Sequence, residues 1–139
     1  MTVVTERIEL ETPGEVQVVD VTDRVQAAVA SSGLGSGIAC VFNPGSTGAL
    51  TTIEYEPGLV ADLPAALERL FPRDIRYRHE DTWHDGNGHS HVRASMMGPG
   101  LAVPFVDGSL TLGTWQQIVF LELDNKPHRR SLVVQMVGE

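Results

Sequence analysis

The strongest constraint on the fold is a series of short apolar runs, separated by turn residues, that fills the C-terminal third of the chain. Between the first two runs stands Asp107-Gly108, a dipeptide that favours a two-residue β-hairpin turn. Runs of this length are shorter than ordinary core helices and match the usual length of strands. The C-terminal third is therefore predicted to be antiparallel sheet. The runs are Leu101–Val106, Ser109–Leu112, Trp115–Leu123 and Ser131–Val137.

Earlier in the chain, runs of the same kind alternate with segments that have the signals of helices. Residues 23–31, 59–70 and 90–97 show helical spacing of apolar side chains or follow a capping residue. No repeat, low-complexity tract or linker interrupts the sequence. The prediction is one α+β domain over residues 1–139, a β-rich two-layer sandwich with two or three helices. The earlier strands are expected at Thr5–Thr12, Glu15–Val19, Gly37–Phe42 and Ala49–Tyr55.

The ends of the helices carry their own signals. Thr22 is the expected cap of the first helix, and Ser90 of a short helix that runs to Met97 and stops at Gly98. Pro64 lies within the second helical pattern, and it fits there only if it occupies the first turn.

Net charge and cysteine content indicate which kinds of partner the protein can bind and in which cellular compartment we expect it. The formal net charge is −8, which argues against nucleic acid, because binding to the phosphate backbone needs clustered Lys and Arg. The only cysteine, Cys40, lies in an apolar run and is expected to be buried. No signal pattern and no apolar run of about 20 residues is present, so we expect a cytoplasmic protein that does not enter a membrane.

Four of the five histidines fall between residues 79 and 91, together with several acidic residues. Imidazoles gathered in a glycine-containing loop are common metal ligands, and neutral nitrogen donors favour zinc or a similar divalent transition metal. The spacing matches no named zinc signature, and a polar loop with solvated histidines would look similar. The predicted metal ligands are His79, His84, His89 and His91.

Three further features point to acid–base chemistry or phosphate recognition. If Ser90 caps a helix, His91 lies in its first turn, where free backbone N–H groups favour an anion. Glu54 follows a buried strand and is a candidate acid, base or ligand, although surface acids are also common there. Arg129 and Arg130 form a cationic pair suited to phosphate, and an edge-strand charge pair describes them equally well.

Several segments from Val41 to the C-terminus together resemble the YjbQ family, also called the secondary thiamine-phosphate synthase family. The most specific are Ser90-His91-Val92, the run from Leu101 to Phe105, and Leu112-Gly113-Thr114-Trp115-Gln116-Gln117-Ile118 leading to Glu122. The segments 45–54 and 77–79 also look like family segments, whereas the first forty residues add little.

The resemblance implies a homotrimer with polar clefts between its subunits. It also implies an enzyme that joins hydroxymethylpyrimidine diphosphate to a thiazole phosphate and releases diphosphate. The matching site candidates are His79, Glu54, His91, Trp115, Gln116 and Glu122.

We therefore expect His91 and Glu54 to be catalytic and phosphorylated small molecules to be the substrates. The alternative is a non-catalytic homotrimer that binds a metal or a metabolite. Many relatives have a histidine where this chain has Gly45, so a site that used it must be rebuilt, and His84 or His89 are candidates to replace it. The expected substrate-binding residues are Ser90, Trp115, Gln116, Arg129 and Arg130.

Overall fold

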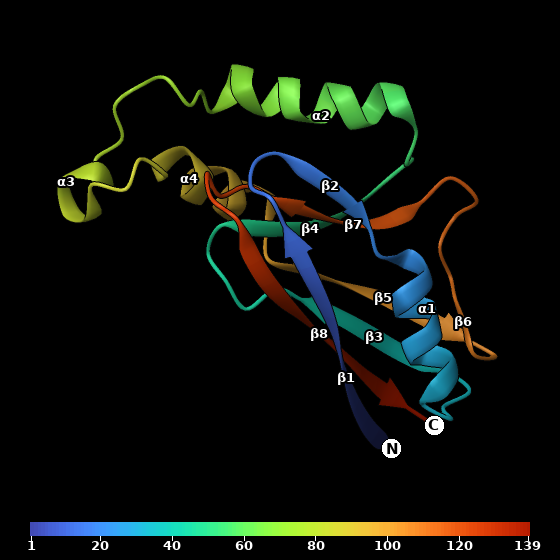
Figure 1. Ribbon diagram of the computed structural model, residues 1–139. Coiled ribbons are helices and arrows are strands. Elements are labelled where there is room, and N and C mark those ends of the chain that lie inside the picture. The colour runs from blue at the N-terminus through green and yellow to red at the C-terminus, as the bar shows by residue number, and fades with distance from the viewer.

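The computed structural model describes residues 1–139 and contains two antiparallel sheets that pack face to face, with α1 (Thr22–Ser31) packed into the core between them and the other helices outside (Figure 1). The larger sheet has the strand order β1-β8-β3-β5-β6, and the smaller sheet has the order β2-β7-β4. The predicted α+β class and the β-rich sandwich are confirmed. The strands are β1 Thr2–Thr12, β2 Gln17–Asp20, β3 Gly37–Phe42, β4 Gly48–Ile53, β5 Gly100–Val106, β6 Ser109–Leu110, β7 Gln117–Glu122 and β8 His128–Gly138.

The predicted hairpin at Asp107-Gly108 connects β5 to β6 and pairs Val106 with Ser109. Both turn residues have positive φ, 49° at Asp107 and 74° at Gly108, as a tight two-residue hairpin turn requires. The segment Asn125-Lys126-Pro127, which separates the last two predicted runs, connects β7 to β8, but these two strands pair in different sheets. The chain therefore crosses from one sheet to the other between Leu123 and Pro127.

The main core lies between the two sheets. Inward-facing residues such as Val41 and Phe105 of the larger sheet meet Leu50 and Phe120 of the smaller one, and all four are at most 2% exposed. A second, smaller apolar cluster lies on the other face of the smaller sheet, where Leu67 covers it. The smaller sheet is thus the middle layer of the molecule, and Figure 1 shows α2 and α4 on its outer side.

Four helices are present: α1 Thr22–Ser31, α2 Pro57–Leu70, α3 Glu80–Trp83 and α4 Gly88–Met97. Three predicted helix ends are wrong in detail. Thr22 is the first residue of α1, and its own backbone N–H donates a hydrogen bond to Oδ1 of Asp20. Ser90 lies inside α4. Pro64 lies within α2 beyond its first turn, since the helix starts at Pro57, where Glu56 accepts hydrogen bonds from the N–H groups of Gly58 and Leu59.

The outer face of the larger sheet has no element over it and is partly apolar. Cys40 lies on this face and is exposed, so the prediction of a buried thiol is wrong for the single chain. The reason is the alternation of β3, in which Ala39 and Val41 point inward and the residue between them points out. Other exposed apolar side chains on this sheet are Val3, Ile38, Phe42, Val106 and Val137. None of the helices is long and apolar enough to cross a bilayer.

Candidate functional site at the start of α4

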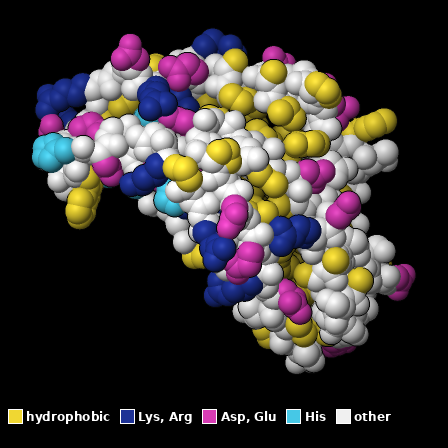
Figure 2. All heavy atoms as spheres, viewed as in Figure 1, with side chains coloured by type: hydrophobic (Ala, Val, Ile, Leu, Met, Phe, Trp, Pro, Cys, Tyr) yellow, Lys and Arg dark blue, Asp and Glu magenta, His cyan; other side chains and the backbone are white.

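Two of the predicted histidines meet at the start of α4. His79 comes from the turn before α3, and His91 is the fourth residue of α4. Their ring centroids are 4.3 Å apart and the ring planes are tilted by 40°. Figure 2 shows the histidine side chains of this face gathered at the end of the molecule where α3 and α4 lie.

Three buried polar atoms of this segment have no hydrogen-bond partner: Nε2 of His79 itself, and Oδ1 of Asn87 and Oγ of Ser90 at the start of α4. An Oδ1 atom of Asp85 lies 3.5 Å from Nε2 of His79 without forming a hydrogen bond. Most buried polar groups in native proteins are paired, so unpaired ones gathered in one place indicate room for a ligand or water. We call His79, Asn87, Ser90 and His91 the histidine cluster.

The pKa of His91 is lowered from its ordinary value. Burial is the main cause, and the neighbouring His79 adds to it, against the opposing effect of the carboxylates of Asp124 and Asp85. His91 is therefore neutral at pH 7, with a ring nitrogen that can accept a hydrogen bond or bind a metal.

A small cavity of about 210 Å³ lies on the same side of α4, one helical turn after His91. It is formed by Ala94 and Ser95 of the helix and by the loop that contains Gly45, Ser46 and Gly48. A Cβ atom at position 45 would lie only 2.9 Å from Nη1 of Arg130. A histidine at this position would therefore have to displace the end of this arginine side chain.

Arg130 is not available for phosphate in this structure. It is 7% exposed and binds Glu122 through two hydrogen bonds of 2.8 and 2.6 Å, with a third to Thr47 at 2.9 Å. Its neighbour Arg129 points to the other face and pairs with exposed Glu11 at 2.9 Å. Alternation along β8 separates the two side chains, so they do not act as one cationic pair.

Glu122 and Asp124 anchor a buried polar network that the sequence did not reveal. Thr12 donates to Glu122 at 2.6 Å, and Asp124 accepts hydrogen bonds from Thr47 and Asn87 and contacts His128 at 2.6 Å. The only sign of this network in the sequence was the match of Glu122 to the family pattern. We call Thr12, Thr47, Glu122, Asp124 and Arg130 the sheet-end network.

The two carboxylates of the sheet-end network keep their charge. Burial alone would raise the pKa of Glu122, but the hydrogen bonds from Arg130 and Thr12 lower it overall. Burial would likewise raise the pKa of Asp124, and hydrogen bonds from His128 and Asn87 lower it. Both groups are therefore held as carboxylates by the donors around them.

The other two predicted metal ligands lie elsewhere. His89 is 1% exposed and contacts Glu15 at 2.7 Å, in a cluster that also holds Arg93 and Glu68. His84 is exposed and ends α3 with a left-handed φ of 56°. No group of three His, Cys, Asp or Glu residues is arranged to hold a metal ion. The set of four histidine ligands therefore does not fit, while the unpaired Nε2 of His79 leaves the pair His79 and His91 as a partial site.

The backbone N–H groups at the start of α4 already bind a carboxylate side chain of the protein. The carboxylate of Glu80 accepts hydrogen bonds from the N–H groups of Gly86 at 2.7 Å and Gly88 at 2.8 Å. A phosphate at the histidine cluster would therefore depend on side chains more than on this helix end.

The remaining predicted residues lie at the opposite end of the smaller sheet. Glu54 is exposed and directly follows β4, whose six residues span about 20 Å from the loop beside α4. Trp115 is 71% exposed and precedes β7 instead of belonging to it. Glu54 and His91 thus lie far apart within a single chain. That they share one site stays a prediction, and it requires that a second copy of the chain contributes one of the two residues.

The sequence profile of the family described as "UPF0047 protein YjbQ-like" matches residues 6–139. The match includes most of the N-terminal segment, where sequence reasoning found little. A UPF0047 protein of Methanothermobacter thermautotrophicus is 39% identical over 139 residues, which is 100% of this chain and 95% of the relative. One from Mycobacterium tuberculosis (strain H37Rv) is 37% identical over 121 residues, 87% of this chain and 89% of the relative.

Solved structures agree with these sequence matches. A YbjQ-like protein of unknown function from Sulfolobus solfataricus superposes with a TM-score of 0.89 at 29% identity, covering 99% of this chain and 100% of that one. An uncharacterized protein of the YjbQ/UPF0047 family from Clostridium acetobutylicum gives a TM-score of 0.86 at 34% identity, with 95% and 99% coverage.

Proposed function

Because this chain belongs to the YjbQ-like UPF0047 family, we propose that it is an enzyme of the secondary thiamine-phosphate synthase type. It would join hydroxymethylpyrimidine diphosphate to a thiazole phosphate and release diphosphate. The observation that carries the proposal is the histidine cluster, where two imidazoles meet and where the start of α4 contains buried polar atoms that the protein leaves unpaired. The hydroxyl of Ser90 and a ring N–H of His79 can donate to the acceptor oxygens of a phosphorylated substrate, whereas Oδ1 of Asn87 can only accept, from an N–H or O–H of the ligand.

In the proposed reaction, the thiazole nitrogen forms a bond to the methylene carbon of the pyrimidine while the bond from that carbon to the diphosphate oxygen breaks. The electron pair leaves with the diphosphate, and the new thiazolium carries the positive charge. Ring N–H groups of His79 and His91 would donate hydrogen bonds to the departing oxygens, and the hydroxyl of Ser90 would donate a third. Their role would be to hold and stabilise the leaving group.

Positive charge is scarce at this site, because Asp85 and Glu80 lie nearby and Arg130 is engaged. A divalent cation bound by His79 and His91 would supply the missing charge on the diphosphate.

The direct test mixes the purified protein with both substrates and follows diphosphate release. The proposal predicts release that requires both substrates and that disappears in His91→Ala. Release with the pyrimidine diphosphate alone would indicate a hydrolase instead. No release under any condition would contradict the proposal.

A non-catalytic homotrimer that binds a metal or a metabolite is the second proposal. It is favoured by the neutral His91 beside His79 and by the exposed apolar face of the larger sheet, where Ile38 is 53% and Phe42 is 42% exposed. Exposed apolar faces of this kind mark surfaces that bind other proteins. Stoichiometric metal in elemental analysis of untagged protein, without turnover, would support this proposal.

The trimer has its own test. Light scattering at micromolar concentration should give three times the 15.1 kDa mass of the chain. Ile38→Lys should lower that mass, because it places a charge in the apolar face. A monomeric wild-type protein would contradict both the trimer and a site shared by Glu54 and His91.

A further inference from the structure

The short helix α3 is not fixed by burial, because none of its residues is buried. Figure 1 shows it projecting beyond α4, away from both sheets. Yet His79, which directly precedes this helix, lies against His91 of α4 with the ring centroids 4.3 Å apart. Polar contacts must therefore hold this segment in place.

The carboxylate of Glu80 supplies such contacts. Its Oε2 accepts a hydrogen bond from the N–H of Gly86 at 2.7 Å and its Oε1 one from the N–H of Gly88 at 2.8 Å, across six and eight residues of the chain. The two bonds close the intervening loop at its base. His79 comes directly before this base, and α4, which contains His91, begins at it. Closure of the loop therefore sets the distance between the two histidines.

Gly88 leaves room for this closure. A Cβ atom at position 88 would lie 2.9 Å from Oε1 of Glu80 and would overlap the Cβ atom of Tyr77. The segment before α3 thus packs directly against the first residue of α4. Tyr77 is itself held, since its hydroxyl donates to the carbonyl of Pro72 at 2.6 Å. Any side chain at position 88 would push the two segments apart.

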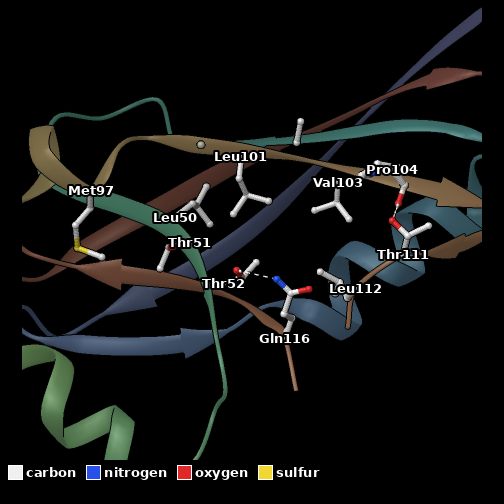
Figure 3. A pocket seen from close by; sticks show the side chains of 12 residues that line it. Leu50, Thr51, Thr52, Met97, Leu101, Val103, Pro104, Thr111, Leu112 and Gln116 are labelled. Atoms are coloured by element: carbon white, nitrogen blue, oxygen red, sulfur yellow. Dashed lines mark hydrogen bonds between the residues drawn. The ribbon is translucent and has the colours of Figure 1, made fainter. Parts of the chain in front are cut away.

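Gln116 also accepts a hydrogen bond from a glycine N–H, but its effect is local. Gln116 lines a cleft of about 390 Å³ between β4 and β5 (Figure 3), and its Oε1 accepts from the N–H of Gly113 at 2.9 Å. That bond spans three residues and fixes only the turn before β7. Glu80 instead connects two segments that each carry a histidine, and a charged acceptor forms stronger hydrogen bonds than a neutral amide does.

We infer that Glu80 is a positioning residue, which holds His79 against His91. A hydrogen bond from Asn125 to the carbonyl of Asp85, at 3.1 Å, would keep the later part of the loop in place without Glu80, so the part next to His79 would move. The consequence for catalysis rests on the proposed function. A displacement of about 1 Å in catalytic groups costs about 10²-fold in rate.

The test replaces Glu80 and observes the two imidazole rings by NMR. The wild type should show a nuclear Overhauser effect between the ring protons of His79 and His91, and Glu80→Ala should lose it. Glu80→Gln keeps one acceptor oxygen, so it should retain part of the effect. Glu80→Ala should also lower the proposed synthase rate about a hundredfold, because the rings no longer meet.

Glu56→Ala is the matched control, because Glu56 accepts the N–H groups of Gly58 and Leu59 at the start of α2 in the same way. It should lower the unfolding midpoint in urea as Glu80→Ala does, but leave the Overhauser effect and the rate unchanged.

Three results would overturn the inference: no Overhauser effect in the wild type, a full effect in folded Glu80→Ala, or the same loss in Glu56→Ala. Loss of the effect in Glu80→Ala alone, in a protein whose wild type has no synthase activity, would uphold the positioning role and remove only the proposed function.

Discussion

Two polar clusters lie side by side in this protein, and they differ in how completely their groups are paired. In the sheet-end network, the carboxylates of Glu122 and Asp124 are 0% and 2% exposed and accept hydrogen bonds from several donors. In the histidine cluster, three buried polar atoms have none. Asn87 stands at the boundary, because its Nδ2 donates to Asp124 while its Oδ1 is unpaired.

This difference indicates that the sheet-end network stabilises the fold and that the histidine cluster binds a ligand. A buried network with every group paired fixes one arrangement of the strands, and removing one member leaves a charge without a partner. A cluster with unpaired groups lowers stability in the free protein and gains bonds when a ligand arrives. The predictions below test this division, starting with the largest expected effect.

The first prediction is that Arg130→Met destabilises the fold by about 3–5 kcal/mol, because it leaves the buried carboxylate of Glu122 uncompensated. Urea denaturation followed by circular dichroism measures this change. Arg129→Met is the matched control, since its exposed pair with Glu11 should contribute less than about 1 kcal/mol. Equal effects of the two substitutions would remove the distinction between buried and exposed arginine.

The second prediction concerns the histidine cluster. His91→Ala should reduce the proposed synthase rate by a factor of about 10²–10⁴, the usual contribution of one imidazole in acid–base or leaving-group chemistry. Its unfolding midpoint in urea should change far less than that of Arg130→Met, since no hydrogen bond of the His91 ring is lost. His84→Ala, at an exposed position, should leave the rate unchanged. A large loss of stability in His91→Ala with full activity would show that His91 serves the fold and not the reaction.

The third prediction is that stability falls as the pH drops below about 5. Glu122 and Asp124 have pKa values below their ordinary 4.5 and 3.8 in the folded state, so the unfolded chain binds protons first. Their contribution is complete above the ordinary values and is lost as the pH falls through the lowered ones. Urea denaturation between pH 7 and pH 3 measures this slope, and Asp124→Asn should flatten it. An unchanged slope in that variant would show that Asp124 titrates normally.

The fourth prediction has the smallest effect. NMR titration should place the pKa of His91 below the ordinary 6.5, mainly because the ring is buried. The unfolded chain therefore takes up the proton more readily, and His91 reduces stability as the pH falls below that value. His79→Ala should raise the pKa of His91 slightly, since His79 is the second cause of its lowering. A lower pKa of His91 in His79→Ala than in the wild type would mean that His79 stabilises the protonated form of His91.

Much of the fold could be predicted from the sequence because it depends on local patterns. Apolar runs bounded by turn residues predicted β3 and β8, and the positive φ values at Asp107-Gly108 are the ones that this dipeptide tolerates. Pro64 was harder, because a side-chain cap by Glu56 moved the start of α2. The exposure of Cys40 followed from its place in the alternation of β3, which the apolar character of the run concealed.

The site could be predicted only in part, because nearness in sequence is not nearness in space. His89 and His91 are two residues apart on α4, so they point about 200° apart around its axis. One therefore faces Glu15 and the other faces His79. Asp124 was missed because its partners Thr47 and Asn87 lie in distant segments. Its contact with His128 spans a turn of four residues, and no sequence signature marks that contact.

The position of β8 also bears on how the protein is made. This strand is the last element of the chain, yet it lies in the larger sheet between β1 and β3, with eleven residue pairs to β1. Because β8 follows β1 and β3 in the chain, each of these two strands has an open edge during synthesis until β8 has left the ribosome. We expect the nascent chain to depend on chaperones during that interval, and folding to be limited by the insertion of one central strand.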